Sequence, residues 1–188
     1  MRFFPLAALA SAALLTYAAP AQAQATMTEP TQTKKPEDKS KRPSPPAMVK
    51  TTVRGTDVTI DYSRPSVKGR AAFGPKTPLA PAGEVWRTGA NEATTFTVSK
   101  DVKIEGKALP AGTYALFTIP GPTEWTVIFN KTAKQWGAYE YKAADDVLRV
   151  KVKPKTVATP VEQFTITADK SGKVSLMWDK TEASFMVK

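Results

Sequence analysis

Apolar and polar residues alternate with a period of two over most of the chain from Val49 onward. The clearest runs are Val58–Tyr62, Thr94–Val98 and Leu148–Lys153, where every second position is apolar or threonine. Successive side chains of a strand point to opposite faces of a sheet, so each run predicts a strand with one buried face. Weaker runs predict further strands at residues 50–54, 102–105, 113–119, 125–130, 163–167, 174–178 and 184–187.

Glycine- and proline-rich turn signals separate these runs, for example Arg54-Gly55-Thr56-Asp57 and Pro120-Gly121-Pro122. Nine or ten short strands at this spacing predict an all-β domain, built as an antiparallel β-sandwich or barrel. Helix is expected only as single turns near residues 132–135 and 143–146. Prolines and a glycine make residues 65–83 a long connection, and long connections are often functional.

The first 23 residues predict an export signal. Arg2 supplies a positive start, residues 3–19 form an apolar run, and Ala21-Gln22-Ala23 offers a cleavage site after Ala23. The alternative is an uncleaved membrane anchor. No cysteine follows the run, which argues against lipidation, and no later stretch is apolar enough to span a bilayer. We therefore expect a periplasmic or secreted protein with no integral membrane segment after signal removal.

Residues 24–48 differ in composition from the rest of the chain. Prolines recur there among Thr, Gln, Lys and Glu, with almost no large apolar side chain, so the segment buries too little to order itself. The predicted organisation is a signal peptide (1–23), a disordered Pro/Lys-rich linker (24–48) and a single all-β domain (49–188).

The chain contains neither cysteine nor histidine and has a formal net charge of +10. Without these residues it lacks the usual ligands of zinc, iron and copper and the usual base of Ser and Cys hydrolases, and we expect no metal and no cofactor. In an exported protein, the positive charge favours anionic envelope polymers over nucleic acid as partners. A simple gain in solubility explains the charge equally.

The richest stretch is Val85–Glu92, which combines an indole, a guanidinium, a carboxamide and a carboxylate around Gly89. Guanidinium groups bind carboxylates and phosphates, and an exposed indole stacks on a sugar. In a structural interpretation, Arg87 instead pairs with Glu92 or Asp61, Trp86 fills the core, and Gly89 adopts a positive φ. The candidate ligand-binding residues here, with the two arginines of the preceding connection, are Arg64, Arg70, Trp86, Arg87, Asn91 and Glu92.

A second aromatic cluster follows the strand predicted at 125–130 and adds Trp136 and Tyr139 to the candidate residues. Such a cluster is typical of a sugar-binding platform, but it also fits a loop that caps the end of a β-sandwich. Further along, Arg149, Lys151 and Lys153 project from one face of a predicted strand. Outward lysines commonly guard an edge strand against pairing with another chain.

Several of these motifs resemble those of one bacterial family. They are Asp61–Arg70, Val85–Thr94, Leu109–Tyr114, Glu124–Asn130 and Trp136–Tyr139. The resemblance is to the domain of unknown function family 2911, and it extends from about residue 49 to the C-terminus. It implies an exported bacterial envelope protein, but it brings no activity, ligand or catalytic residue. Because this chain has no lipidation cysteine, the resemblance does not imply a lipid anchor.

These observations favour a non-catalytic binding or structural module of the cell envelope or secreted space, with anionic or glycan ligands. The alternative is a carboxylate-dependent glycan hydrolase or lyase that uses Glu92 with another carboxylate such as Asp61. The sequence contains no nucleophile elbow and no phosphate-binding loop. Whether the protein is an enzyme is left open, with the non-catalytic interpretation preferred.

Overall fold

The computed structural model describes residues 37–75, 77 and 79–188. The predicted signal peptide and residues 24–36 of the predicted linker lie outside the described residues. Within these ranges the chain is mostly strand, and its helix is confined to two short 3₁₀ turns, η1 (Lys39–Lys41) and η2 (Ala143–Asp145). The predicted all-β class with antiparallel sheets is therefore confirmed. None of the helices in these ranges has the length and apolar character needed to cross a bilayer.

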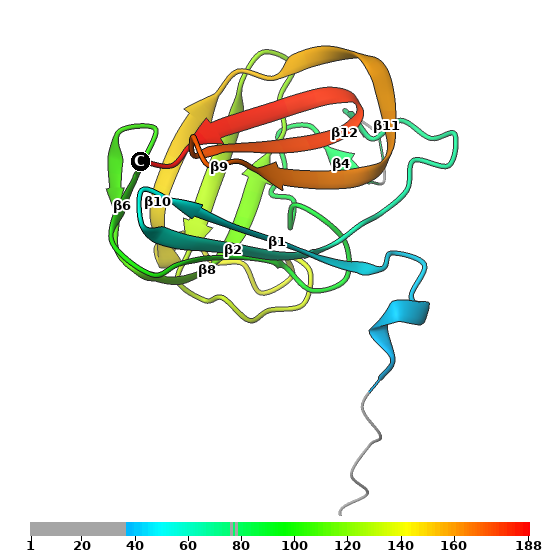
Figure 1. Ribbon diagram of the computed structural model, residues 1–188. Coiled ribbons are helices and arrows are strands. Elements are labelled where there is room, and N and C mark those ends of the chain that lie inside the picture. The colour runs from blue at the N-terminus through cyan, green and yellow to red at the C-terminus, as the bar shows by residue number, and fades with distance from the viewer. Residues whose placement is uncertain (1–36, 76, 78) are drawn as a thin grey trace, which may run out of the picture. The chain divides into compact units, whose positions relative to one another are not determined.

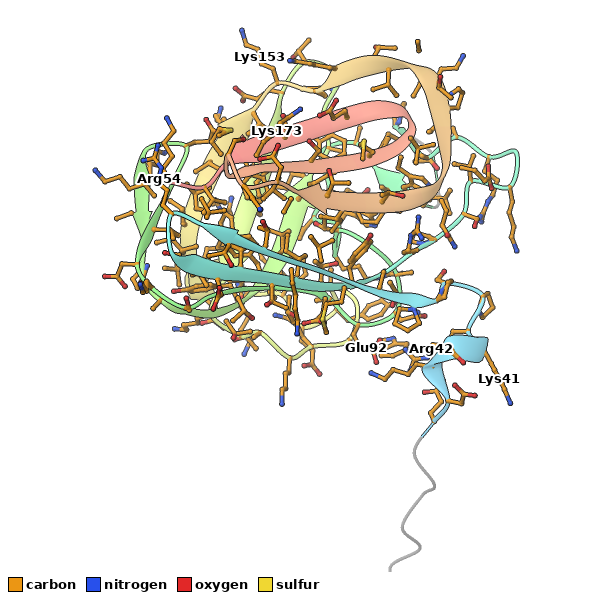
Figure 2. The ribbon with its side chains drawn as sticks, viewed as in Figure 1. Lys41, Arg42, Arg54, Glu92, Lys153 and Lys173 are labelled. Carbon is orange, nitrogen blue, oxygen red and sulfur yellow. The ribbon has the colours of Figure 1, made fainter. Side chains whose placement is uncertain are left out.

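Six strands form the main sheet in the order β1-β2-β5-β8-β9-β10, and every neighbouring pair is antiparallel (Figure 1). Their bounds are β1 (Pro46–Val53), β2 (Thr56–Ser63), β5 (Thr94–Val98), β8 (Gly112–Ile119), β9 (Trp125–Asn130) and β10 (Asp146–Val152). β1 begins within the predicted linker, so the described residues 46–48 belong to the first strand. β10 ends the sheet, which fits the edge role predicted for its row of basic side chains; Lys153, just beyond it, points away from the protein (Figure 2).

A long hairpin packs over one face of this sheet (Figure 1). It consists of β11 (Lys155–Ala168) and β12 (Lys173–Met186), each 14 residues long. The three short strands predicted in this region are therefore parts of two long ones. Two small pairs complete the fold: β3 (Phe73–Gly74) with β4 (Ala80–Pro81), which run parallel inside the long connection, and β6 (Val102–Ile104) with β7 (Lys107–Leu109).

The main core lies between the sheet and the hairpin. Phe96 of β5 and Phe129 of β9 meet Phe185 of β12, with ring centroids 6.0 and 5.8 Å apart. All three rings are buried, and edge-to-face contacts of this kind add to the stabilisation from burial itself. A chain without disulfides therefore gains its stability from an aromatic core.

The opposite, outer face of the sheet is covered only in part. Over β8 and β9, the loop of residues 131–142 buries Phe117 and Ile128, and Tyr141 meets the Phe117 ring at 5.0 Å. Over β2 and β5, the outer face carries the directly paired Asp61 and Thr95, which are only half-buried. A pocket forms on the outer face at the border between the part covered by this loop and the polar part over β2 and β5. Residues of the loop form one of its walls.

Several hydrogen bonds hold this loop. Tyr141 donates a hydrogen bond of 2.6 Å to Asp146, and Asn130 donates one of 2.8 Å to the same carboxylate. Between the ends of the loop, the Ala93 N–H donates to the Gln135 carbonyl at 3.0 Å. The helical turn predicted at residues 132–135 is wrong, because none of these residues is helical and the Gln135 carbonyl accepts from the Ala93 N–H of another loop; the turn predicted at 143–146 is confirmed by η2.

Candidate functional site

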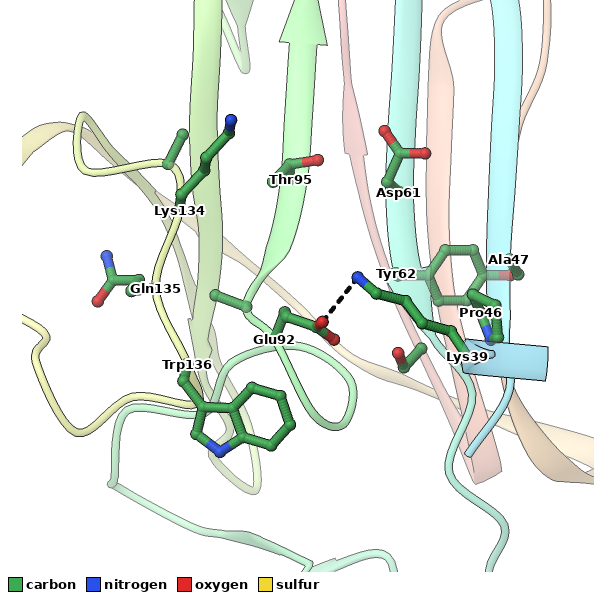
Figure 3. A pocket seen from close by; sticks show the side chains of 13 residues that line it. Lys39, Pro46, Ala47, Asp61, Tyr62, Glu92, Thr95, Lys134, Gln135 and Trp136 are labelled. Carbon is green, nitrogen blue, oxygen red and sulfur yellow. Dashed lines mark hydrogen bonds and ion pairs between the residues drawn. The ribbon is translucent and has the colours of Figure 1, made fainter. Parts of the chain in front are cut away.

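A pocket of about 650 Å³ lies on the outer face of the sheet, at the border between the part covered by the loop of residues 131–142 and the polar part (Figure 3). Trp136 and Lys134 of the covering loop stand on one side, and the end of β2 stands on the other. Among the residues that line it are Lys39, Asp61, Glu92, Thr95, Lys134 and Trp136. The pocket thus combines one aromatic surface with hydrogen-bonding groups and charges of both signs.

Backbone pairing between two loops brings Glu92 beside Trp136. The two residues form an isolated antiparallel bridge, and the Gly137 N–H donates to the Asn91 carbonyl at 3.0 Å. Residues on either side of such a bridge project close to each other. The carboxylate and the indole are therefore neighbours because of backbone hydrogen bonds, independently of any contact between their side chains.

The loop that carries Glu92 has an unusual backbone. Thr88, Gly89 and Asn91 have φ values of 54°, 156° and 59°. A positive φ is rare for a β-branched residue such as Thr88, and it is held here by a hydrogen bond of 2.6 Å from the Thr94 hydroxyl to the Thr88 carbonyl. Strained backbone is often found at binding sites, where the surrounding structure maintains it.

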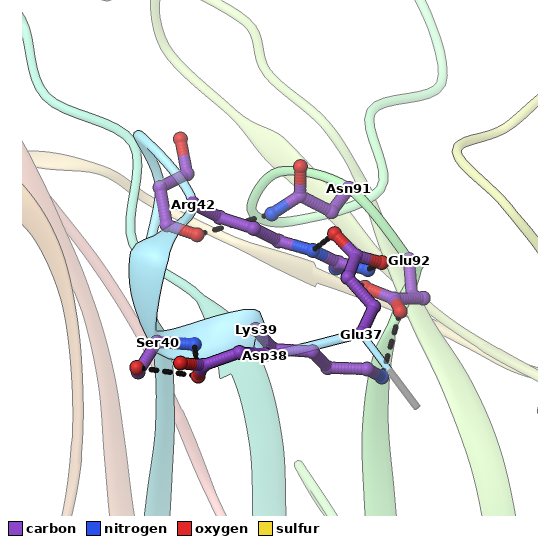
Figure 4. Close-up of polar contacts among 8 residues, drawn as sticks. Glu37, Asp38, Lys39, Ser40, Arg42, Asn91 and Glu92 are labelled. Carbon is purple, nitrogen blue, oxygen red and sulfur yellow. Dashed lines mark hydrogen bonds and ion pairs between the residues drawn. The ribbon is translucent and has the colours of Figure 1, made fainter. Parts of the chain in front are cut away.

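Residues 37–44, which we call the N-terminal strap, lie against this loop (Figure 4). The Asp38 carboxylate caps the short helix η1 by accepting from the Ser40 N–H at 3.2 Å. Asn91 donates to the Ser44 carbonyl at 3.0 Å. The strap thus makes specific contacts with the domain, although its composition predicts part of a disordered linker.

Two cations of the strap converge on one carboxylate. Lys39 Nζ lies 2.8 Å from Glu92 Oε1, and Arg42 Nη1 lies 2.7 Å from Glu92 Oε2. Partial burial raises the pKa of Glu92, but hydrogen bonds from Lys39 and Arg42 outweigh it and lower that pKa to about 2. Glu92 is therefore ionised throughout the neutral range.

Arg42 also lies over the exposed indole of the pocket. Its guanidinium carbon is 5.6 Å from the centre of the Trp136 ring, within the range of a cation–π contact. The Arg42 side chain is only 11% exposed, whereas Trp136 is 54% exposed. The strap therefore covers part of an aromatic surface that is otherwise open to solvent.

The structure brings together three of the residues predicted as a site, namely Asn91, Glu92 and Trp136. It places Trp86 elsewhere: this indole is 3% exposed and packs in the main core between β12 and β11. An indole so deeply buried has no free face for a ligand. The structural interpretation of Trp86 and the positive φ expected at Gly89 are both observed.

Arg64, directly before the long connection, and Arg70 within it both bind backbone carbonyls. Arg64 Nε donates to the Phe164 carbonyl at 3.1 Å, which fastens the connection to β11. Arg70 closes a turn by donating to the carbonyls of Ser66 and Val67 at 2.9 and 3.0 Å. Neither arginine is among the residues that line the pocket. Both side chains thus stabilise the local backbone.

Arg87 lies near Tyr139, outside the pocket lining. Burial lowers the pKa of Arg87, and the nearby Tyr139 opposes this effect. Its buried Nε has no hydrogen-bond partner among the described residues. Over the same ranges Glu92 pairs with Lys39 and Arg42, so the alternative pairing of Arg87 with Glu92 is not formed. Tyr139 is 84% exposed.

Sequence reasoning missed four residues of the site: Lys39 and Arg42 in the strap, Thr95 on β5, and Lys134 in the loop. The only signal for the first two was the basic run Lys39-Ser40-Lys41-Arg42 next to acidic residues. Thr95 is one of two outward threonines of β5, with Thr97, and nothing local distinguishes it. Over the described ranges, no three acidic side chains gather in a way that would hold a metal ion.

Comparisons with known proteins agree with the resemblance noted in the sequence. The searches of curated proteins and of solved structures each give no match. The model of the family described as "Protein of unknown function (DUF2911)" matches residues 44–187. This span contains every strand of the fold, from β1 to β12, and all the pocket residues except Lys39. The chain therefore belongs to the DUF2911 family.

Proposed function

We propose that the protein is a non-catalytic carbohydrate-binding module whose ligand places one sugar ring against Trp136. The observation that carries this proposal is the 54% exposed indole on the wall of a pocket of about 650 Å³. Exposed tryptophans are uncommon, and ligand sites combine an apolar surface with a few fixed polar groups. The pocket has the size of small-molecule sites in general.

The polar groups around the indole suit the hydroxyls of a sugar. Each hydroxyl both donates and accepts, and the pocket offers acceptors on Asp61, a donor on Lys134 and both on Thr95. A sugar ring also has an apolar face of C–H groups that packs against an aromatic ring. A fully anionic ligand fits less well, because Asp61 and Glu92 line the same pocket and Arg64, Arg70 and Arg87 do not.

The charge state of Glu92 argues against glycoside hydrolysis with this residue as the acid. Most glycosidases need one protonated carboxyl group to donate to the leaving oxygen. Glu92 has its pKa lowered to about 2 despite partial burial, because Lys39 and Arg42 donate to it. With the strap in place Glu92 is thus ionised at neutral pH, which disfavours its use as the acid.

The place of action belongs to the same proposal. Residues 1–23 have the composition of an export signal, and residues 24–36 have that of a linker to the domain. We infer that the mature protein begins at Gln24 and acts in the periplasm or outside the cell. Mass spectrometry of the protein from cell fractions tests this: an N-terminus at Gln24 supports export, and an intact Met1 in the cytoplasm contradicts it.

Binding is tested by isothermal titration of the full chain with neutral oligosaccharides of glucose and of N-acetylglucosamine. We expect Trp136→Ala to lower the affinity at least tenfold, because it removes the stacking surface. Met48→Ala is the matched control, since it removes an apolar side chain that is 56% exposed on β1 and outside the pocket lining. Equal affinity of Trp136→Ala and the unchanged protein would refute the proposal.

A further inference from the structure

We propose that Glu92 and Trp136 form a subsite for a positively charged group, so that the sugar bound in the pocket is an amino sugar with a free ammonium. This inference rests on the proposed function and specifies its ligand. A carboxylate beside an exposed indole is the arrangement that binds organic cations, through an ion pair on one side and the ring face on the other.

The chain itself shows what this subsite accepts. The strap places an ammonium, Lys39 Nζ, at 2.8 Å from Glu92 and a guanidinium, that of Arg42, at 2.7 Å from the same carboxylate (Figure 4). The guanidinium also lies over the Trp136 ring at 5.6 Å. Two different cationic groups thus meet the Glu92 carboxylate, and one of them, the Arg42 guanidinium, also lies over the Trp136 ring. The Arg42 group stands in for the ammonium of a ligand.

The charged side chains that the domain contributes to the pocket also favour a cationic ligand. Of the charged side chains that line the pocket, only Lys39 comes from the strap; the domain contributes Asp61, Glu92 and Lys134. Two carboxylates against one ammonium leave a negative excess for a ligand to neutralise. An N-acetylated sugar has no charge to place there, whereas a free amino sugar has one.

Binding of such a ligand requires the strap to move. The strap is held by the ion pair of Lys39 with Glu92, whose side chains are 54% and 38% exposed, by the less exposed Arg42 with its contacts to Glu92 and Trp136, and by the hydrogen bond from Asn91 to the Ser44 carbonyl. Exposed ion pairs are individually weak and are screened by salt, so a ligand that makes the same contacts competes with them. Lys39 and Arg42 are then internal competitors, and removing one of them strengthens ligand binding.

The test compares glucosamine, N-acetylglucosamine and glucose oligomers of equal length by titration with the full chain. We expect the glucosamine oligomer to bind at least tenfold more tightly than the other two, and Glu92→Gln to abolish that preference while neutral oligomers still bind. Arg42→Gln is expected to raise the affinity for the glucosamine oligomer severalfold. Its matched control is Lys41→Gln, which removes the same charge from a strap side chain that is 84% exposed.

The outcomes separate this inference from the proposed function. Equal binding of all three oligomers, lost in Trp136→Ala, would overturn the cation subsite and leave the carbohydrate module standing. Binding of none would overturn both. A preference for glucosamine that persists in Glu92→Gln would show attraction to the protein's charge at another place, and would also overturn the subsite. A thermal melt of each variant verifies that it is folded.

Discussion

The indole of Trp86 stacks on the indole of Trp178, with ring centroids 5.6 Å apart and planes inclined by 11°. Trp86 comes from the loop that leads to the pocket, and Trp178 comes from β12 of the long hairpin. The Trp86 Nε1–H donates to the Gly89 carbonyl at 3.1 Å, so the same side chain also fixes the turn before Glu92. One buried residue thus connects the position of the site loop to the main core.

The first prediction is that Trp86→Ala destabilises the fold strongly. Large-to-small substitutions of buried aromatic residues cost about 3–5 kcal/mol, because they lose burial and leave a cavity. We expect Trp136→Ala to change the free energy of unfolding by less than about 0.5 kcal/mol, as is usual for exposed positions. Denaturant unfolding of both variants measures the difference. Similar values for the two would mean that Trp86 does not support the core as described.

Gly89 gives the second prediction, because a side chain there would meet the end of β2. A Cβ at Gly89 would lie 2.9 Å from the Ser63 carbonyl oxygen, and the residue has a φ of 156°. Gly83 also has a positive φ, of 82°, but a Cβ there would meet nothing within 4 Å. We expect Gly83→Ala to cost about 1–2 kcal/mol for its backbone conformation. Gly89→Ala should cost about 1–3 kcal/mol more, because of the added clash.

Thermal unfolding of the two alanine variants in parallel checks this difference. Binding of the oligosaccharide probe gives a second measurement, since Gly89 is in the loop that carries Glu92. Gly89→Ala is expected to weaken binding, and Gly83→Ala is expected to leave it unchanged. If the two variants were equally stable, the close approach of Gly89 to Ser63 would not restrict the loop.

The strands were predictable wherever one face of the sheet meets the core and the other meets solvent. Alternation located β2, β5 and β10 because their side chains are sorted by a period of two. It found only the ends of the long hairpin nearest the core, since residues 155–163 of β11 are largely exposed. That half of β11 contains Pro160 and irregular register with β12, so no burial pattern marks it as a strand.

The site was predictable in its chemistry but not in its geometry. Asn91, Glu92 and Trp136 stood out because polar and aromatic residues cluster in loops, and the structure brings them together. The sequence could not tell that Trp86 packs in the core while Arg87, its neighbour, lies near Tyr139. The strap contacts were also hidden, because ion pairs between residues 50 or more positions apart leave no local pattern.

The third prediction concerns Tyr141, which holds the loop of residues 131–142. Burial, together with its hydrogen bond to the Asp146 carboxylate, raises the pKa of Tyr141 to about 12. The ordinary value is about 10, so the folded state holds this proton more tightly than the unfolded state. The stabilisation is fully present below pH 10, and it is lost as the pH rises toward 12.

Tyr141→Phe isolates this effect. We expect the variant to be about 1–2 kcal/mol less stable at neutral pH, because it loses a hydrogen bond to a charged group. Between pH 10 and 12 its stability should fall less than that of the unchanged protein. Tyr114, whose pKa burial also raises, is present in both proteins and cancels in the comparison. If the stability of the two proteins fell equally between pH 10 and 12, the pKa of Tyr141 would not be raised by folding.

The acid side of the pH range tests the strap. Glu92 has a pKa of about 2 in the folded protein and an ordinary value of 4.5, because its hydrogen bonds to Lys39 and Arg42 outweigh the effect of burial. A lowered pKa means that the stabilisation is complete above pH 4.5 and is lost as the pH falls toward 2. Glu37 also accepts hydrogen bonds from the Arg42 guanidinium, which lower the pKa of Glu37. Its contribution to stability is therefore lost on acidification as well.

We therefore predict that acidification releases the strap while the core stays folded. The signal to follow is the indole N–H resonance of Trp136 by NMR, identified with Trp136→Phe. It should move between pH 4.5 and 2 toward its position in Glu92→Gln at neutral pH, since both changes remove the charge that holds Arg42 over the ring. Glu37→Gln keeps the Glu92 ion pairs, so the Trp136 indole resonance of this variant should still move between pH 4.5 and 2. A resonance that is insensitive to pH in the unchanged protein would mean that the Glu92 charge does not hold the strap in solution.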